Sequence, residues 1–171
     1  MWLWKGDPLA KTVFNQLDLN AVPLPVNDVY TSLQTDMING VYISPYACLA
    51  LQWFTKTDYM MNYPLTYSNG AVLMNNSKLN SLPEEYRKIL IEESQKSMKR
   101  IVKQSRKDNQ ESIEKLKESG IKITSITDQT KKMYRNAGIA TRKELAGELY
   151  SEEILNRVLD LLEEYRSQNK E

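Results

Sequence analysis

The sequence contains no histidine, and this absence removes the most common general base and the most common metal ligand. Its single cysteine, Cys48, excludes an internal disulfide, and its apolar neighbours indicate a core thiol rather than a nucleophile. The six glycines are scattered singly, so no glycine-rich phosphate loop is present. No serine lies beside an obvious base either. We therefore predict that the protein is not an enzyme.

An excess of charge and long apolar runs are also missing. The 23 basic residues balance 22 acidic ones, which gives a net charge of +1 and no electrostatic argument for nucleic acid or an anionic membrane surface. No apolar run approaches the ~18 residues that a membrane helix requires, and no basic-then-apolar leader opens the sequence. Taken alone, these absences favour the cytoplasm.

Short strands and helices alternate in the first part of the chain. We expect strands at residues 1–5, 21–25 and 41–44, with helices that begin at Asp7 and Asn27. This alternation predicts an α/β fold with a parallel sheet and right-handed crossovers. Residues 45–54 have almost no polar face and are predicted to form a buried helix.

Residues 59–66 and 71–75 are predicted to be extended and flank an Asn69-Gly70 pair. Such a pair is typical of a tight hairpin turn. The alternative, that this segment is a connection, depends on the resemblance described below.

The character of the chain changes at Ser81, where a capping box predicts the start of a helix that ends near Gly120. Such a helix would be roughly 55 Å long, whereas a domain of this size is about 30 Å across. It must therefore project, pair with another helix, or bridge two lobes. A short strand at 121–124 and a helix capped by Thr127 or Asp128 follow.

Ser151 is predicted to cap the last helix, whose apolar face is too broad to be left in water. We expect this face to pack on something. One stripe contains Ile154, Val158, Leu161 and Tyr165, and Leu155, Leu159 and Leu162 widen it.

The run AVPLPVNDVYTSLQTDMINGVY resembles the signature of solute-binding proteins of TRAP transporters, the tripartite ATP-independent importers of organic acids. Asp36 and Asn39 depart from that signature, which usually has Gly and Asp there. The resemblance continues through LMNNSKLNSLPEEYRKIL and YSEEILNRVLDLLEEYRSQ, and so covers nearly the whole chain.

This resemblance implies a fold, an organisation and a location. The fold would be a periplasmic-binding-protein-like lobe with βαβ units, plus a long spanning helix and C-terminal helices. Residues 1–80 would form the second lobe, 81–120 a spine helix, and 121–171 a strand and helices that pack on the lobes. Family members are exported and about twice this length, so we expect the C-terminal half of a periplasmic or extracytoplasmic protein. The connection at residues 59–75 would then pass between lobes, and we favour it over the hairpin.

The expected ligand site combines aromatic and apolar walls with a fixed donor. Strand alternation places Trp2 and Trp4 on one face of the first strand. The resemblance implies that the remaining positions line the ligand cleft. For any single residue, core or interface packing is the competing interpretation. The predicted site consists of Trp4, Val26, Tyr42, Ile43 and Asn69.

The resemblance also implies two absences from this site. The family's substrate-binding arginine would lie at or just before Met1, and no arginine occurs before Arg87. Relatives that bind 2-oxo acids with a metal have a carboxylate at the pair occupied here by Tyr42 and Ile43. We therefore predict no metal, and no other cofactor.

The leading hypothesis is the solute-binding component of a TRAP transporter, which captures a small organic acid between two lobes and delivers it to membrane subunits. The alternative is a ligand-free interaction module, such as a fragment that forms a homodimer. Neither hypothesis involves nucleic acid.

Overall fold

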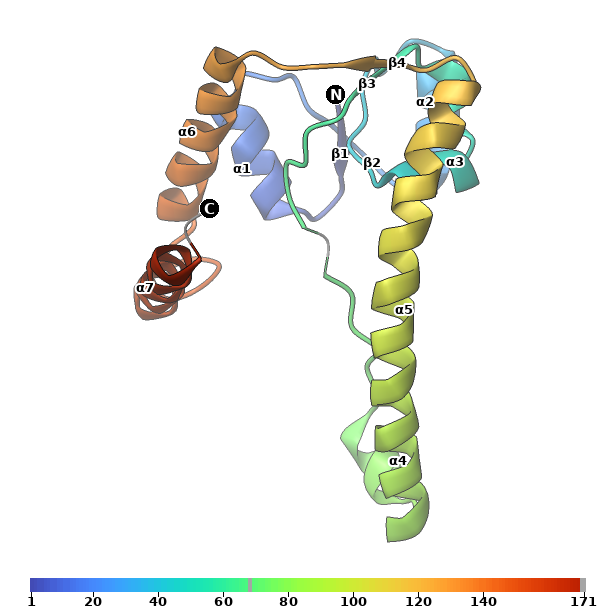
Figure 1. Cartoon of the computed structure of the whole chain (residues 1–171), viewed down its shortest axis with the longest axis vertical. Coiled ribbons are helices and arrows are strands. Elements are labelled where there is room, and N and C mark those ends of the chain that lie inside the picture. Colours follow the sequence, from blue (N-terminus) through green and yellow to red (C-terminus); the bar gives the residue numbers. More distant parts are fainter. Residues whose placement is uncertain (68, 170–171) are drawn as a thin grey trace. The chain divides into compact units, whose positions relative to one another are not determined.

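The computed structural model describes residues 1–67 and 69–169, which form two compact units (Figure 1). Unit 1 contains Met1–Tyr42 and Ser125–Glu171, and unit 2 contains Ile43–Thr124. These bounds differ from the predicted division at residues 80 and 120. The two units do not test whether the chain divides into a lobe, a spine helix and a C-terminal segment, so that division stays a prediction.

Unit 1 opens with the predicted βαβ unit. Strand β1 (Trp2–Trp4) pairs in parallel with β2 (Val22–Leu24), and helix α1 (Pro8–Gln16) connects them. Asp7 caps α1, because its Oδ1 accepts a hydrogen bond from the Ala10 N–H at 2.9 Å. The predicted α/β fold with a parallel strand pair is thus confirmed for this segment.

Helix α2 (Val26–Gln34) begins two residues earlier than an N-cap at Asn27 predicts. Asn27 is therefore wrong as the N-cap: Pro25 occupies that position and has no side chain with which to cap the helix. Beyond its end, Asp36 adopts a left-handed backbone with φ of 57°. Only Gly takes this conformation without strain, and Asp tolerates it better than most residues. This explains why a position that usually has Gly accepts Asp here.

Residues 41–44 are not a strand, and this prediction was wrong. One backbone bond joins the preceding residue to β1, from the Trp2 N–H to the Gly40 carbonyl at 2.7 Å. The chain then turns into the next helix, whose N-cap is Ser44. The sheet of unit 1 therefore has two strands rather than three.

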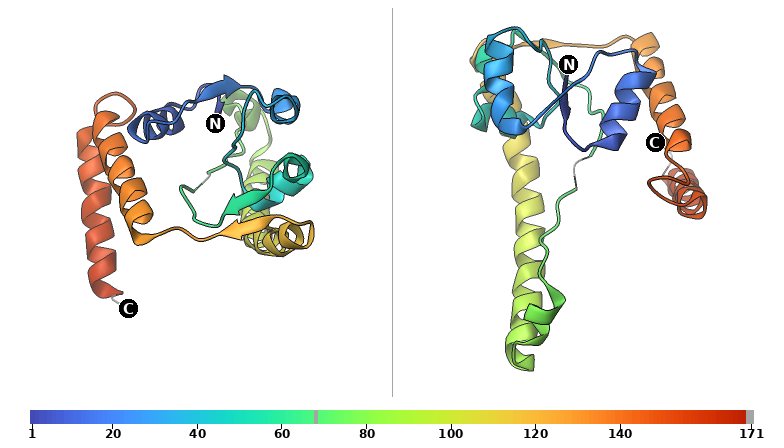
Figure 2. Two further views of the ribbon diagram at one scale, coloured as in Figure 1. Left: turned by 90° about the horizontal axis from the view of Figure 1, so that it is seen from above. Right: turned by 180° about the vertical axis from the view of Figure 1, so that it is seen from behind.

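Two further helices complete unit 1: α6 (Asp128–Glu144) and α7 (Glu152–Gln168) (Figure 2). Their predicted caps are confirmed, since the hydroxyl of Thr127 accepts from the Thr130 N–H and that of Ser151 accepts from the Ile154 N–H. Helix α6 packs against α1. The core of this unit contains Leu3, Ala10 and Phe14, with Met1, Val13, Ala21 and Tyr42 against it.

Unit 2 has a second parallel strand pair, between β3 (Tyr59–Met61) and β4 (Lys122–Thr124). In the described residues β3 therefore pairs with β4 and not with residues 71–75, so the hairpin is not formed. Helix α3 (Pro45–Ala50) and a 3-10 turn, η1 (Trp53–Lys56), replace the single helix expected at 45–54. They are separated at Gln52, where φ is 57°.

Helix α5 (Glu84–Glu118) is the 35-residue helix that the sequence predicts. Its expected capping box is wrong, because Ser81 instead ends the short helix α4 (Asn76–Asn80) and donates its hydroxyl to the Lys78 carbonyl. Pro83, with φ of −50°, precedes α5. The predicted stop is confirmed at Ser119 and Gly120, where Gly120 has φ of +95°.

The buried part of unit 2 is small. Trp53 and Leu116 are fully buried, and Ile121 is buried beside the end of α5 in the sequence. Helix α3 packs on α5 but contains no fully buried residue, so the expectation of a buried helix was wrong. Within the described ranges, no helix combines the length and the apolar character needed to cross a membrane.

Candidate functional site

The carboxyl edge of the β1–β2 sheet brings several chain segments together. Trp4 and Leu24 are paired as the last residues of the two parallel strands. Helices α1 and α2 begin within four residues of these ends, so both helix N-termini arise from this edge. Open α/β sheets bind ligands at this kind of edge, where strand ends and helix starts converge.

Tyr42 is fixed at this edge by two hydrogen bonds. Its hydroxyl accepts from the Trp4 backbone N–H at 3.3 Å and donates to Oδ2 of Asp7 at 3.1 Å. The Asp7 carboxylate thus both caps α1 and holds the phenol. Tyr42 is therefore a rigid part of this edge rather than a free side chain.

The ring of Tyr42 is half-buried among other aromatic side chains. Its centroid lies 5.3 Å from that of Trp2 and 5.3 Å from that of Phe14, the latter in an edge-to-face arrangement. Burial, together with the nearby Asp7 carboxylate, raises the pKa of Tyr42 to about 12, although the hydrogen bond from Trp4 acts in the opposite direction. The phenol is accordingly neutral at physiological pH and can act as a donor.

The two tryptophans of β1 have different surroundings. Trp2 is 3% exposed, and its indole N–H donates to the Leu24 carbonyl at 3.0 Å, which ties the two strands together. Trp4 is 57% exposed at the end of the strand. Trp2 therefore belongs to the core, while Trp4 offers an aromatic surface to a ligand or partner.

The two helix N-termini at this edge differ in their capping. That of α1 is occupied by the Asp7 carboxylate, whereas α2 has no side-chain cap. Val26, half-buried, is the first residue of α2. The positive end of the helix dipole favours an anion at this place, but the first turn of α2 already carries the carboxylate of Asp28. A carboxylate is one such anion.

Ile43 and Asn69 belong to unit 2, whereas the other three predicted site residues belong to unit 1. Ile43 is half-buried and Asn69 is exposed. The structure thus brings Trp4 and Tyr42 into contact, and it places Val26 at the start of α2, which begins at the same edge. The contribution of Ile43 and Asn69 to a ligand site stays a prediction.

Asp7 is the site residue that the sequence did not suggest as one. The Asp7-Pro8 pair identifies a helix cap, but the contact with Tyr42 spans 35 positions and has no local signal. Strand alternation places Trp2 and Trp4 on one face of β1, so it likewise could not show that Trp2 is a core residue and Trp4 an exposed one. Both assignments require the packing of Phe14 and Tyr42 to be known.

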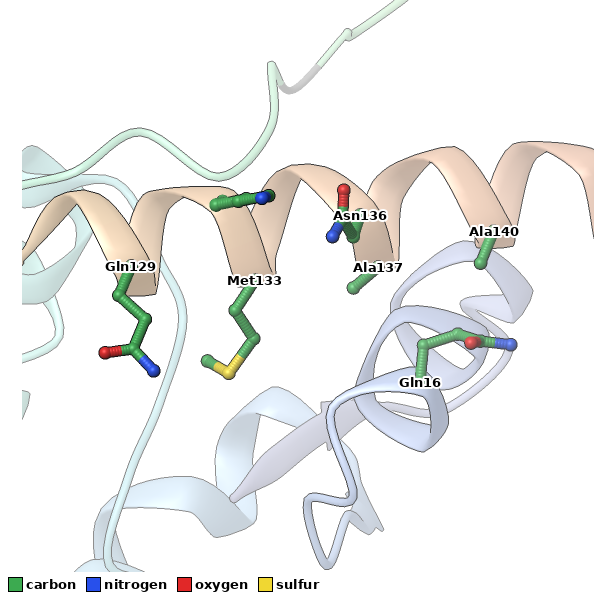
Figure 3. Close-up of a pocket in the computed structure, with 7 residues that line it drawn as sticks. Gln16, Gln129, Met133, Asn136, Ala137 and Ala140 are labelled. Carbon is green, nitrogen blue, oxygen red and sulfur yellow. The ribbon is translucent and has the colours of Figure 1, made fainter.

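A groove of unit 1 lies where α6 meets α1, apart from the sheet edge (Figure 3). This open groove of about 460 Å³ has polar and apolar walls, and the side chains of Gln129, Met133 and Ala137 extend from α6 toward the α1 side. Gln16 of α1 also donates to Oε2 of Glu144 at 2.8 Å across the same two helices. The groove is lined by Gln16, Gln129, Lys132, Met133, Asn136, Ala137 and Ala140.

None of these places provides a set of metal ligands. Across residues 1–67 and 69–169, no group of three or more Cys, Asp or Glu side chains is arranged to hold a metal ion. Cys48 is half-buried, and burial raises the pKa of its thiol, which disfavours the reactive thiolate. The groups that the sheet edge offers are an aromatic surface at Trp4, the phenol of Tyr42 and backbone donors of α2.

Comparison with known proteins gives consistent matches. Residues 5–148 match the sequence model of the family described as bacterial extracellular solute-binding protein, family 7 (DctP). The chain is 25% identical over 132 residues to the 2,3-diketo-L-gulonate-binding periplasmic protein YiaO of Escherichia coli (strain K12), a match that covers 77% of this chain and 40% of YiaO.

Solved structures show the same fold at low sequence identity. A TRAP periplasmic solute-binding protein from Desulfovibrio salexigens with bound orotic acid has a TM-score of 0.75 and 19% identity, over 98% of this chain and 53% of that one. One from Ochrobactrum anthropi, with its C-terminus in its ligand pocket, has a TM-score of 0.73 and 20% identity, over 98% and 52%. One from Sulfitobacter sp. NAS-14.1 with bound β-D-galacturonate has a TM-score of 0.71 and 16% identity, over 86% and 48%.

These matches confirm the predicted periplasmic-binding-protein-like fold class. The chain spans about half the length of the solved structures it resembles, and less than half of YiaO.

Proposed function

Because the chain belongs to family 7 of the bacterial extracellular solute-binding proteins, we propose that it forms the ligand-binding lobe of a TRAP transporter receptor for a small organic acid. The family is one of transport proteins rather than of enzymes. We extend this to the chain itself: it binds a solute and catalyses no reaction. The location would be periplasmic or extracytoplasmic, and the membrane subunits of the transporter would receive the solute.

The observation that carries the proposal is the carboxyl edge of the β1–β2 sheet. It combines the exposed ring of Trp4, the fixed phenol of Tyr42 and the uncapped N-terminus of α2 at Val26. An aromatic wall and backbone donors near a positive helix end suit a carboxylate that carries a ring or a chain of hydroxyl groups. The ligands named for the similar proteins, orotic acid, galacturonate and 2,3-diketo-L-gulonate, are all organic acids.

The remaining predicted site residues, Ile43 and Asn69, would complete the cleft in the intact receptor. We propose that a second lobe closes over the ligand from the opposite side, as the predicted organisation requires. Exposed apolar residues of unit 2 support a further lobe, because Tyr67, Val72 and Leu73 are 90%, 77% and 89% exposed. Large apolar side chains left this exposed are typical of surfaces that a partner covers.

The test is a residue-resolved NMR titration of the chain with sodium galacturonate. We expect saturable shifts at the Trp4 indole, at Tyr42 and at the first amides of α2, with weak affinity because this chain supplies one wall of the cleft. Galactose, which lacks the carboxylate, is the matched control ligand and should leave the α2 amides unchanged. Equal effects of galactose and galacturonate would contradict the proposed anion site.

Two variants separate this site from nonspecific binding. Trp4→Ala should reduce the galacturonate-induced shifts, because it removes the exposed aromatic wall. Tyr86→Ala removes an equally exposed aromatic side chain, 60% exposed on α5, and should leave the shifts unchanged. If both variants behave like the parent chain, Trp4 is not part of the ligand site.

A second function is supported by the same exposed apolar surface of unit 2. A ligand-free interaction module would use Val72 and Leu73 to bind a protein partner and would show no response to any carboxylate. The galacturonate titration distinguishes the two functions, because localised saturable shifts at the sheet edge occur only in the receptor.

A further inference from the structure

One face of α7 carries four exposed apolar side chains. Ile154, Val158, Leu161 and Tyr165 are 59%, 54%, 44% and 65% exposed, so burial within the chain does not account for them. The spacing of 4, 3 and 4 residues places all four along one seam of the helix. We refer to this set as the α7 seam.

The other apolar residues of α7 are on a different side and are already partly covered. Leu155, Leu159 and Leu162 are half-buried. Leu159 and Leu162 line a groove of about 390 Å³ together with Arg142 of α6. Contacts to the rest of unit 1 therefore use this second side and leave the α7 seam open.

The α7 seam is self-complementary. Its spacing is the same in both directions along the helix, so an antiparallel second copy brings Ile154 opposite Tyr165 and Val158 opposite Leu161, each pair occurring twice about the two-fold axis. Alternation of three- and four-residue spacings is the pattern that lets side chains interlock between two helices. An isologous interface requires this kind of self-matching surface.

The charges that flank the α7 seam select the antiparallel arrangement. Arg157 and Glu164 lie on the same border of the seam, seven residues apart. In an antiparallel pair, Arg157 of each copy lies near Glu164 of the other, which forms two equivalent ion pairs. In a parallel pair, Arg157 would instead face Leu162, and no ion pair would form.

Both flanking side chains are available for this role. The described residues give neither Arg157 nor Glu164 an ion pair within the chain, and both are exposed. From the seam and its flanking charges, we propose that α7 is a homodimerisation helix, which pairs antiparallel with α7 of a second copy. The 17-residue helix is roughly 25 Å long, so the interface is small and the dimer is weak and dependent on concentration.

The test is sedimentation of the chain across a range from low to high micromolar concentration. We expect the parent to shift from 19.8 kDa toward twice this mass as the concentration rises. Arg157→Glu and Glu164→Arg, made singly, each place like charges together in the antiparallel pair and should weaken dimerisation by about tenfold. The double variant restores opposite charges and should dimerise like the parent.

Matched variants show whether dimerisation uses the α7 seam. Glu163→Arg makes the same charge change as Glu164→Arg but lies on the opposite side of α7, and it should dimerise like the parent. Leu161→Glu buries a charge in the α7 seam and should abolish the dimer. Circular dichroism of each variant shows whether its helix content is retained.

Three outcomes would overturn the proposal. The parent could remain at 19.8 kDa at every concentration, which would leave the α7 seam to another occupant, such as a second lobe of a receptor. It could dimerise with no response to Leu161→Glu, which would place the interface elsewhere. Alternatively, the double charge variant could fail to recover while it retains its helix content, which would exclude the antiparallel pairing. None of these depends on whether galacturonate binds.

Discussion

Unit 1 encloses an aromatic core, whereas unit 2 leaves most of its longest helix uncovered. In unit 1, Trp2 and Phe14 are each 3% exposed and both contact Tyr42. In unit 2, Ser112 and Leu116 are the residues of α5 that are buried, both in its last two turns. The first two-thirds of α5 therefore gain little from packing in this chain.

This difference distinguishes a region that is stable within the chain, the core of unit 1, from a region that is left open to a partner, the early part of α5. A helix whose apolar side chains stay in water depends on its own backbone bonds and on surface ion pairs, which contribute little each. Helix α5 has such ion pairs, for example between Lys88 and Glu84 and between Lys96 and Glu93. We infer that the sheet edge of unit 1 is ordered before any partner binds, while the early part of α5 becomes stable with one.

The largest expected effect comes from the core of unit 1. Phe14→Ala should lower the free energy of unfolding by about 3–5 kcal/mol, because it leaves a cavity beside Leu3 and Tyr42. Phe54→Ala is the matched control in unit 2, where the phenylalanine is half-buried, and should cost less. Urea denaturation followed by circular dichroism measures both, and equal losses would contradict the contrast between the units.

Within α5, the expected effect depends on position. Leu116→Ala should cost about 2–4 kcal/mol of unit 2 stability, because Leu116 is 1% exposed. Leu90→Ala changes a leucine that is 38% exposed in the same helix and should cost less than about 1 kcal/mol. Thermal denaturation compares the two variants. A larger loss for Leu90→Ala would show that the early part of α5 is already packed.

Two glycines, one just past the end of α5 and one inside α6, should respond to the same substitution with opposite signs. Gly120→Ala forces alanine into a left-handed backbone with φ of +95° and should destabilise unit 2 by about 1 kcal/mol. Gly138 lies inside α6 with open space around its Cα, so Gly138→Ala should stabilise unit 1 by about 0.5–1 kcal/mol. Denaturant midpoints measure both changes, and stabilisation by Gly120→Ala would contradict the strained stop of α5.

The smallest effect concerns the hydroxyl of Tyr42. Tyr42→Phe removes its bonds with Trp4 and Asp7 and should cost about 1 kcal/mol or less near neutral pH. The pKa of Tyr42 is raised to about 12 in the folded state, against 10.0 for an ordinary tyrosine. Below pH 10 both states are protonated and the residue adds no pH dependence, whereas between pH 10 and 12 the unfolded state ionises first and stability falls.

The Tyr42→Phe variant should lack this part of the decrease in stability at alkaline pH. Spectrophotometric titration of tyrosinate should therefore show one of the ten tyrosines ionising late in the parent and missing from the variant. Retention of the late step in Tyr42→Phe, with one tyrosine lost from the main transition instead, would show that Tyr42 is not the late group.

The sequence predicted those parts of the fold that local signals determine. Asp7-Pro8, Thr127 and Ser151 have cap chemistry that decides a helix start within a few residues, and all three were confirmed. Ser81 carries the same kind of signal, but the helix start predicted there was wrong, because Ser81 is the C-cap of α4. The strand predicted at 41–44 failed for a related reason: a strand requires backbone pairing, and in this described segment the backbone bond to β1 comes from Gly40, which precedes it.

The candidate site was predictable in its residue types but not in its geometry. Trp4 and Tyr42 were named from pattern and resemblance, and the structure places them in hydrogen-bond contact. Asp7 was missed in its second role, because its bond to Tyr42 depends on tertiary packing. The positions of Ile43 and Asn69 in a ligand cleft stay predictions for the same reason.

Amide hydrogen exchange resolved along α5 tests the contrast between the units most directly. We predict that amides in its first half, around Tyr86 and Ile101, exchange about tenfold or more faster than those around Ser112 and Leu116, and faster than those of α1. Uniform protection along all 35 residues of α5 would contradict this contrast, since the helix would then be stable without a partner.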